Sequence, residues 1–380
     1  MLNCIKYLSF YSLNPKDNSA AADTKVKYIS HTLEILGYTV DLISANSGRN
    51  TKIVDAHTIS LSDKTRLISF KQLPNGNFVK RFIRNKFNKY QLKKYLKYNL
   101  KNDDTIIIYH SLYYYKLYKW IKKHSKAKII LEVEEIYSDV NKVRFITRDK
   151  EVKSFSYADA FIFPSKLLND HINVKNKPFT IIYGTYNIER HCGQSFNDGR
   201  IHVVYAGTFD PRKGGVAAAA AAAQFLTVDY HVHILGFGTD IDTKNLIKTI
   251  KEVSMKTDCL ITYDGLKSGD DYIKFIQSCD IGLSTQNPDA AFNATSFPSK
   301  ILSYMSNGLR VVSIRIPAVE ESFIGRYMYY YDNQTPEEIA KAIKGVDLND
   351  SYDSIEVIKD LDKDFKFNIN RMIKELNDEN

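Results

Sequence analysis

The sequence predicts an α/β protein built from two Rossmann-like domains, each with its own parallel sheet. The chain has 380 residues and is 44% apolar, which is more than a single domain usually buries. β-branched apolar runs alternate with helical patterns in both halves, as in repeated βαβ units. The stretch 187–200 is polar and aperiodic. We therefore predict domains at 1–186 and 201–350, a linker at 187–200, and a helix at 351–380 that packs back toward the first domain.

Short apolar runs mark the strands of the first half. Between the first two, Val26, Ile29, Leu33 and Leu36 recur at helical spacing, which predicts a helix over 24–36. The strands are expected at 4–10, 38–43, 105–109, 128–133, 160–163 and 180–182.

The second half repeats the same alternation. Its strands are expected at 201–206, 230–235, 259–263, 280–284, 310–314 and 328–331. Its helices are expected at 214–226, 243–256, 269–278, 299–306 and 336–344. The alanine run 217–223 suits a close-packed helix, because alanine is the best helix former.

Charge divides the chain into two unlike halves. Residues 1–190 hold 33 Lys and Arg against 17 Asp and Glu, whereas residues 191–380 hold 20 against 27. This asymmetry indicates that the first half meets an anionic surface and the second does not.

The stretch 79–101 concentrates that charge, with nine Lys and Arg and no acid. Apolar residues recur within it at helical intervals, which predicts a basic amphipathic helix. Such a face suits anionic lipid, with a solvated helix face as the plain alternative. No nucleic-acid recognition motif is present, so nucleic acid is not an expected partner. The membrane patch is expected to comprise Lys80, Arg81, Arg84, Lys86, Lys93, Lys94 and Lys97.

No run of apolar residues is long enough to span a bilayer, and the opening segment is predicted to be a buried strand. The cysteines are scattered without CxxC spacing, which indicates reduced thiols and neither a metal site nor a disulfide framework. We expect a cytoplasmic protein, peripheral at the inner face of the cytoplasmic membrane. The four cysteines are Cys4, Cys192, Cys259 and Cys279.

A loop after the strand 201–206 has the residues of a phosphate site. Gly207 and Thr208 follow the strand, and Lys213 precedes two glycines. Ligands of open α/β sheets bind beyond the carboxyl ends of strands, where lysine and glycine backbone suit a phosphate. By itself this loop is more typical of an ordinary strand–turn–helix connection with a solvated lysine.

A second anion site is predicted where a helix begins after 293. Thr295 and Ser296 stand where an N-cap would be, Pro298 suits the first turn, and Lys300 follows. Free N–H groups beside a lysine attract anions, although a plain capped helix would look the same. We predict that this helix start and the turn at 207–215 converge on one diphosphate pocket.

Four motifs in order carry a resemblance: AGTFDPRKGG, HILGFG, YDGLKSGDDYIKFIQSCDIGLS and TSFPSKILSYMSNGLRVVS. Together they resemble the donor domain of GT-B glycosyltransferases, closest to family-4-like enzymes of bacterial capsule and O-antigen synthesis. The resemblance implies two Rossmann-like domains facing a cleft, with acceptor bound by 1–186 and nucleotide sugar bound by 201–350. No cofactor or metal is implied. The donor-binding residues implied are Gly207, Thr208, Lys213, Gly236, Gly238, Asp264, Gly265, Thr295, Ser296, Phe297, Ser299, Lys300 and Ser303.

The chain departs from that family at three positions. Thr208 stands where many relatives have arginine, and Thr295 and Ser303 stand where most have glutamates. Hydroxyls can bond a sugar or ribose, but they cannot act as carboxylates. The donor sugar and the stereochemical outcome therefore stay open.

Catalytic candidates lie in the first half. His110 follows a strand where the family commonly has a cleft histidine, and an imidazole can accept a hydroxyl proton. A hydrogen-bonded structural histidine is the equal alternative. Glu134 and Glu135 end another strand, and one of them could serve as general base.

The sequence thus predicts a metal-independent hexosyltransferase of bacterial surface polysaccharide synthesis. Its expected partners are a nucleotide-sugar donor, UDP-linked first, a glycan or polyprenyl-diphosphate acceptor, and an anionic membrane. The alternatives are a nucleotide-sugar epimerase, a DNA glucosyltransferase, a catalytically silent sugar-nucleotide-binding protein, and a peripheral nucleic-acid binder.

Overall fold

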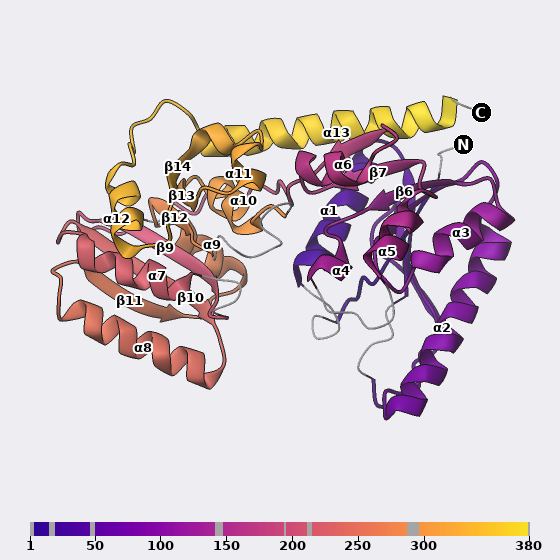
Figure 1. Cartoon of the computed structure of the whole chain (residues 1–380), viewed down its shortest axis with the longest axis horizontal. Coiled ribbons are helices and arrows are strands. Elements are labelled where there is room, and N and C mark those ends of the chain that lie inside the picture. Colours follow the sequence, from indigo (N-terminus) through magenta and orange to yellow (C-terminus); the bar gives the residue numbers. More distant parts are fainter. Residues whose placement is uncertain are drawn as a thin grey trace. The chain divides into compact units, whose positions relative to one another are not determined.

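The chain folds into two α/β units, each built around one sheet (Figure 1). The first unit comprises Met1–Pro164, Leu168–Thr185 and Asp364–Asn380, and the second comprises Ser165–Leu167 and Tyr186–Lys363. This computed structural model describes residues 4–14, 20–45, 50–140, 147–193, 195–210, 215–286 and 296–378.

The sheet of the first unit has eight strands in the order β3-β4-β2-β1-β5-β6-β7-β8. All neighbours are parallel except β3 and β4, which form an antiparallel hairpin at one edge. The chain order reverses between β1 and β5, which makes this the switch point of the sheet. The strands are β1 (Cys4–Ser9), β2 (Thr39–Ser44), β3 (His57–Ser60), β4 (Thr65–Ser69), β5 (Thr105–Tyr109), β6 (Lys128–Glu132), β7 (Ala160–Phe163) and β8 (Phe179–Ile181).

Helices connect these strands, and the end of the C-terminal helix joins this unit. Tyr38 Oη donates to Asn370 Oδ1 over 3.1 Å, and the ring centroids of Tyr28 and Phe365 lie 5.9 Å apart. The helices are α1 (Ala20–Ile35), α2 (Phe78–Asn99), α3 (Tyr115–His124), α4 (Tyr137–Val140), α5 (Arg148–Phe155), α6 (Lys166–Ile172) and the final turns of α13 (Ser354–Asp378).

The sheet of the second unit has six strands, all parallel, in the order β11-β10-β9-β12-β13-β14. This is the Rossmann order, and its switch point lies between β9 and β12. The strands are β9 (Ile201–Thr208), β10 (Tyr230–Phe237), β11 (Leu260–Gly265), β12 (Ile281–Ser284), β13 (Arg310–Ile314) and β14 (Met328–Tyr331).

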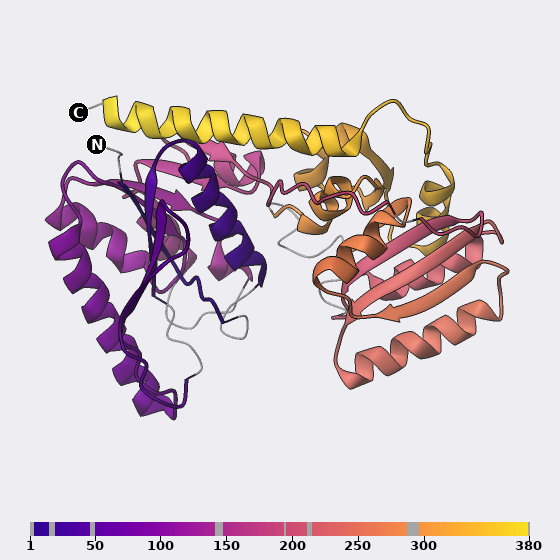
Figure 2. The ribbon, with the colours of Figure 1, turned by 180° about the vertical axis from the view of Figure 1, so that it is seen from behind.

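Helices cover both faces of this second sheet. α7 lies in front of the strands in Figure 1, and the view from behind shows the strands in front of α7 (Figure 2). The elements are α7 (Val216–Ala222) with the 3₁₀ turn η1 (Ala223–Phe225), α8 (Asp240–Ser254), α9 (Gly269–Gln277), α10 (Ser299–Ser306), α11 (Pro317–Glu320), η3 (Gly325–Tyr327) and α12 (Pro336–Lys344).

Two small-residue contacts set how closely helices approach this sheet. Ala219 and Ala220 of α7 are fully buried, as the alanine run predicts. A Cβ on Gly282 would lie 2.3 Å from Cγ of Tyr304, so the ring of Tyr304 rests directly on β12. This contact fixes α10 against the switch point.

The predicted α/β fold with two parallel-sheet domains is confirmed. Every predicted strand is present, with each end within two residues of the expected position. The edge hairpin of β3 and β4 was not predicted. Within the part of the chain that the structure describes, no helix is long and apolar enough to cross a membrane.

Candidate functional site

The carboxyl ends of β9 and β10 meet through two glycines. Gly236 has φ of +134°, and a Cβ there would lie 1.7 Å from the carbonyl oxygen of Gly207. Only glycine tolerates both the conformation and the approach. Beyond this point the backbone N–H of Phe209 still donates to the carbonyl of Phe237 over 2.8 Å. The two strand ends therefore form one continuous floor.

The start of α10 lies against that floor. Nζ of Lys300 lies 3.3 Å from the position that a Cβ of Gly207 would take, and 4.1 Å from the ring centroid of Tyr205. The hydroxyl of Tyr304 accepts a hydrogen bond from the N–H of Ala206 over 2.8 Å, which ties α10 to β9. The end of β9 and the start of this helix are thus side by side.

Lys300 is a cation without a carboxylate partner among the described residues. Burial lowers the pKa of its amine to about 8. The face of Tyr205 offers partial compensation, because an aromatic quadrupole attracts a cation. A partly desolvated ammonium with no counter-ion is a ready position for an anionic ligand.

The helix start itself is uncapped. The N-cap is Pro298, so the prediction that Thr295 or Ser296 caps the helix and that Pro298 lies in its first turn was wrong. Pro298 is extended, with ψ of 101°, and none of the side chains that the structure describes makes a cap hydrogen bond at the start of α10. These groups stay available to an anion. Thr295 lies outside the described residues, and so does Lys213.

A cavity of about 210 Å³ adjoins these strand ends. Two of its walls are exposed apolar side chains, Phe237 at 59% and Leu266 at 66% exposure. The hydroxyls of Tyr272 and Ser303 lie 3.2 Å apart, which links α10 to the cavity wall. The lining residues are Ala206, Gly207, Thr208, Leu235, Gly236, Phe237, Leu266, Lys267 and Tyr272.

Sequence reasoning missed several of these residues. Lys267 and Tyr272 follow the predicted Asp264–Gly265 loop in the sequence. The available signal was the motif that begins YDGLKSGDDY, because it contains both residues. Ser299, at the start of α10, is exposed, whereas Phe297 is buried.

Asp264 is turned toward the interior of the sheet and does not line the cavity. Its carboxylate accepts from Thr262 Oγ1 over 2.8 Å and from His233 Nδ1 over 3.1 Å. Burial favours the neutral acid, but these hydrogen bonds prevail and lower the pKa of Asp264. Gly265 has φ of +77° with open space around it, and Gly238 packs against Phe209. Asp264, Gly265 and Gly238 thus lie at the edge of the site and do not line its cavity.

The switch point of the first unit holds a different cavity, of about 250 Å³. Aromatic side chains dominate its wall. The lining residues are Ser9, Phe10, Tyr11, Ala22, Val26, Tyr109, Ser111 and Tyr137.

Carboxylates gather beside that aromatic cavity. β6 ends at Glu132, so Glu134 and Glu135 follow the strand and do not end it as predicted. Glu134 pairs with Lys25 in a short ion pair. Glu132, which the sequence did not single out, is fully buried and accepts from the hydroxyl of Tyr7. Burial raises the pKa of Glu132 to about 8.

His110 is enclosed in the first unit. Its Nε2 lies 2.8 Å from Oε1 of Glu151, and its Nδ1 lies 2.8 Å from the hydroxyl of Tyr118. Burial lowers the pKa of His110, so the neutral ring donates to Glu151 and accepts from Tyr118. Glu151 also accepts from the N–H groups of Tyr137 and Ser138. Both ring nitrogens are thus engaged, and the catalytic role of His110 stays a prediction.

The basic helix α2 presents its apolar residues outward at its first turns. Phe78, Val79, Phe82 and Ile83 are exposed. Arg84 is buried, which corrects its predicted place in the surface patch, because it belongs with Asn88, Leu92 and Leu96 on the packed face. Five patch residues are exposed, and Lys93 is partly covered beside Trp120. The five are Lys80, Arg81, Lys86, Lys94 and Lys97.

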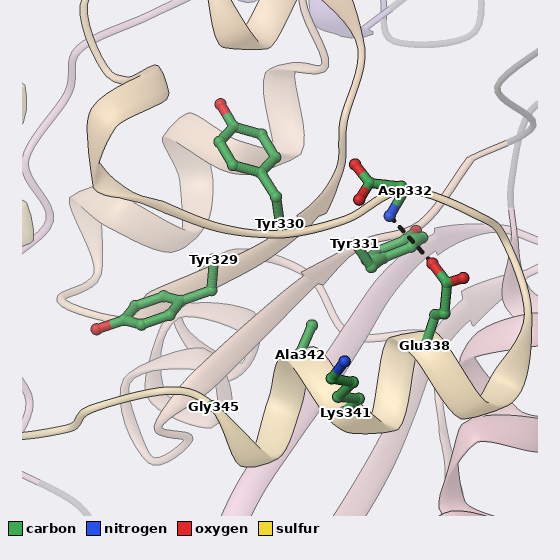
Figure 3. Close-up of a pocket in the computed structure, with 8 residues that line it drawn as sticks. All are labelled: Tyr329, Tyr330, Tyr331, Asp332, Glu338, Lys341, Ala342 and Gly345. Atoms are coloured by element: carbon green, nitrogen blue, oxygen red, sulfur yellow. Dashed lines mark hydrogen bonds between the residues drawn. The ribbon is translucent and has the colours of Figure 1, made fainter.

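A further cavity, of about 450 Å³, lies at the β14 edge of the second sheet (Figure 3). Tyr329, Tyr330 and Tyr331 contribute to its wall, and Glu338 accepts from the N–H of Asp332 over 3.3 Å. In the sheet order this strand is separated from β9 by two others. The cavity is therefore apart from the strand ends that carry the predicted donor residues.

Comparisons with known proteins agree on the fold. No protein-family model matches the chain, and a search of curated proteins found no match. Among solved structures, "Trehalose-6-phosphate from E. coli bound with UDP-2-fluoro glucose" has a TM-score of 0.69 at 11% identity, covering 99% of both chains. A sucrose-phosphate synthase from Thermosynechococcus elongatus has a TM-score of 0.68 at 15% identity, covering 98% of this chain and 99% of its own.

A UDP-forming α,α-trehalose-phosphate synthase from Burkholderia xenovorans is also similar, with a TM-score of 0.60 at 12% identity, covering 98% of this chain and 96% of its own. At such low identity, likeness over nearly whole chains establishes architecture and no more. The chain therefore has the two-domain α/β fold of the GT-B type.

Proposed function

We propose that this chain is a glycosyltransferase that moves a sugar from a nucleoside diphosphate donor to a hydroxyl of a glycan or a lipid-linked acceptor. The observation that carries the proposal is Lys300 at the end of β9, which has no carboxylate partner in the described part of the chain and lies at the start of α10. A cation and free N–H groups at a Rossmann switch point together suit a diphosphate.

The second unit would hold the donor. Lys300 and the N–H groups at the start of α10 would bind the diphosphate, with Ser296, Ser299 and Thr208 as nearby hydroxyl donors. The exposed faces of Phe237 and Leu266 would cover a nucleobase in the adjoining cavity. UDP is the first candidate, because the similar structures include one bound with a UDP sugar and one called UDP-forming.

The first unit would hold the acceptor. Its switch-point cavity is lined by the rings of Phe10, Tyr11, Tyr109 and Tyr137, and aromatic faces suit sugar rings. Glu134 lies beside this cavity, near Tyr109. Burial is the main cause that raises the pKa of Tyr109, and the negative charge of Glu134 is the second. We assign Glu134 as the first candidate for a base that accepts the acceptor hydroxyl proton.

The reaction would depend mainly on the leaving group. As the bond between sugar and diphosphate breaks, negative charge grows on the diphosphate oxygen. Lys300 and the α10 N–H groups would lie beside that growing charge, where they would stabilise the transition state more than the ground state. This chemistry requires no metal ion from the protein.

A thermal-shift series with UDP, GDP, CMP and TDP compounds tests donor binding. A nucleotide at 100 times its dissociation constant should add about 2.7 kcal/mol to the free energy of unfolding. Lys300→Met should remove that shift, whereas Lys274→Met, an exposed lysine on α9, should leave it unchanged. If none of these compounds shifts the wild type, the proposal fails.

A catalytically silent nucleotide-sugar-binding protein is the second candidate. Ser303 favours it, because a hydroxyl that bonds Tyr272 stands where the resembled family has a glutamate. Product analysis with a UDP sugar, a glycan acceptor and a lipid-diphosphate acceptor separates the two. Donor binding without turnover of any pair would support the silent protein.

We also propose that α2 brings the enzyme to an anionic membrane. Phe78 is 76% exposed, and with Val79, Phe82 and Ile83 it forms an apolar surface at the start of the helix. The exposed basic residues of α2 lie close by in sequence, and each adds on the order of 1 kcal/mol near anionic lipid. A surface-lying helix combines these two features. A role in bacterial surface polysaccharide synthesis rests on the motif resemblance and on this surface.

Vesicle sedimentation tests the membrane proposal. The wild type should pellet with phosphatidylserine-containing vesicles and stay unbound with phosphatidylcholine alone. Phe78→Ser with Phe82→Ser should reduce binding at least tenfold, because each change exposes less apolar area to lipid. Lys119→Glu with Lys123→Glu, exposed on α3, is the control. Equal binding by wild type and the phenylalanine variant would contradict the proposal.

A further inference from the structure

Three histidines lie together on one face of the second sheet. His231 and His233 are two residues apart on β10, so their side chains point the same way. His202 of β9 is the register partner of His231. One nitrogen from each ring lies within 4.8 Å of one nitrogen from each of the others. His233 is the first residue of the HILGFG motif, but the proposed transfer reaction uses none of the three histidines.

A chain of hydrogen bonds runs through two of them. Asp198 Oδ1 lies 2.9 Å from His202 Nε2, His202 Nδ1 lies 2.9 Å from His233 Nε2, and His233 Nδ1 lies 3.1 Å from Asp264 Oδ2. Thr262 Oγ1 lies 3.0 Å from His231 Nε2 and 3.3 Å from His233 Nδ1, so it links the third ring to the same network.

The middle contact of this chain joins two ring nitrogens, His202 Nδ1 and His233 Nε2. When the outer nitrogens donate to Asp198 and Asp264, both inner nitrogens present lone pairs. Two lone pairs that face each other can ligate a metal ion placed between them.

The surroundings are those of a closed site. His202 is 2% exposed, His231 9% and His233 1%. The ring of Phe196 stacks on His202 with centroids 4.1 Å apart, and Phe275 meets His233 edge-on at 5.1 Å. A charge is costly in such a place unless surrounding ligands coordinate it.

We propose that His202, His231 and His233 form a binding site for a divalent transition-metal ion, with Zn²⁺ as the expected occupant. Imidazole nitrogens suit Zn²⁺, Cu²⁺, Ni²⁺ and Fe²⁺. In a tetrahedral zinc site with bonds of about 2.0–2.1 Å, neighbouring ligand atoms lie about 3.3 Å apart. The two inner nitrogens therefore need to separate by only a few tenths of an ångström.

The two aspartates complete the arrangement. A ligating histidine usually donates its other N–H to a carboxylate, which fixes the tautomer and the ring orientation. Asp198 and Asp264 stand in that position for His202 and His233. Asp264 lies near the end of β11, next to Gly265. A bound ion would therefore hold β9, β10 and the end of β11 together. The ion is structural and takes no part in the sugar transfer.

Metal titration of the full chain tests the site. The protein is first dialysed against a chelator and then titrated with Co²⁺ and Zn²⁺. We expect one equivalent of Co²⁺ to give the intense visible absorption of a four-coordinate ion, and Zn²⁺ to displace it. Zn²⁺ should also raise the unfolding temperature. Absence of both signals at millimolar metal would overturn the proposal.

Variants locate the ion. His233→Gln should weaken Zn²⁺ binding more than 100-fold, and Asp198→Asn about 10- to 100-fold. Asp198 is partly exposed, so its variant keeps the test available if the buried change unfolds the sheet. His124→Gln, exposed on α3, is the control. If His233→Gln and Asp198→Asn both bind Zn²⁺ as the wild type does, the ion lies elsewhere and the proposal is wrong.

Discussion

The two sheets share a switch-point topology but differ in what surrounds it. In the first unit, the ends of β1 and β5 meet an aromatic cavity, with Lys25 and Glu134 paired beside it. In the second unit, the end of β9 has glycine backbone, and Lys300 has no carboxylate partner among the described residues. In the first unit, Lys25 and Glu134 neutralise each other. In the second unit, the positive charge of Lys300 is left for a ligand to neutralise.

The difference shows that this topology fixes where a ligand binds and leaves the chemistry to a few side chains at the strand ends. An aromatic wall with a paired lysine suits a sugar, whereas an unpaired lysine beside free N–H groups suits a diphosphate. The predictions below act on one unit at a time, so each changes one side of this comparison.

The largest effect is expected in the second unit, from Gly236→Ala. The added Cβ would lie 1.7 Å from the carbonyl oxygen of Gly207, at a φ of +134°. The free energy of unfolding should fall by more than about 4 kcal/mol, as when a severe clash is forced into a packed site. Gly265→Ala, with φ of +77° and open space, should cost only about 1–2 kcal/mol. Equal losses in urea unfolding would show that the glycine contact is not essential.

In the first unit, His110→Ala should destabilise by about 3 kcal/mol, because it leaves the buried carboxylate of Glu151 without one of its partners. His124→Ala on the surface should change stability by less than about 0.5 kcal/mol. Chemical denaturation measures both. Unchanged stability combined with lost transferase activity would instead indicate that His110 acts on the substrate.

Glu132 should give the first unit a distinctive pH dependence. Its pKa is raised to about 8 in the folded protein, mainly by burial. Its contribution is fully present below the unfolded pKa of about 4.3 and is lost as pH rises through the folded pKa. Between those values the slope reaches about 1.4 kcal/mol per pH unit, and Glu132→Gln should abolish it. Parallel stability curves for wild type and variant would refute this.

Much of the fold was predictable because its signals are local. Buried parallel strands are continuous apolar runs, such as Thr105–Tyr109, and the helices between them follow the 3.6-residue period. The hairpin at 57–69 was missed because His57–Ser60 is exposed along its whole length and so shows no burial pattern. The start of α10 was misplaced because hydroxyls before a proline look like caps.

The site was predictable in part. Motif order pointed to Gly207 and Lys300, and their proximity followed from parallel strands sharing one edge. Burial was not predictable: the enclosure of His110 and the inward turn of Arg84 depend on partners far along the chain. The histidine cluster was missed for the same reason, because only the register of β9 with β10 brings His202 to His231.

The most direct test of the central claim is the pH dependence of UDP affinity in the wild type and in Lys300→Met. Only the charged amine binds a diphosphate strongly, and its pKa is lowered to about 8 by burial. The dissociation constant should therefore rise about tenfold between pH 7 and pH 9.

In Lys300→Met, affinity at pH 7 should be about 10- to 100-fold weaker, as expected for loss of a hydrogen bond between charged groups. The remaining pH dependence of the variant reports only the titration of the nucleotide itself. Calorimetric titration gives both constants. Equal affinity and equal pH profiles for the two proteins would contradict the claim that Lys300 at the end of β9 binds the diphosphate of a nucleotide-sugar donor.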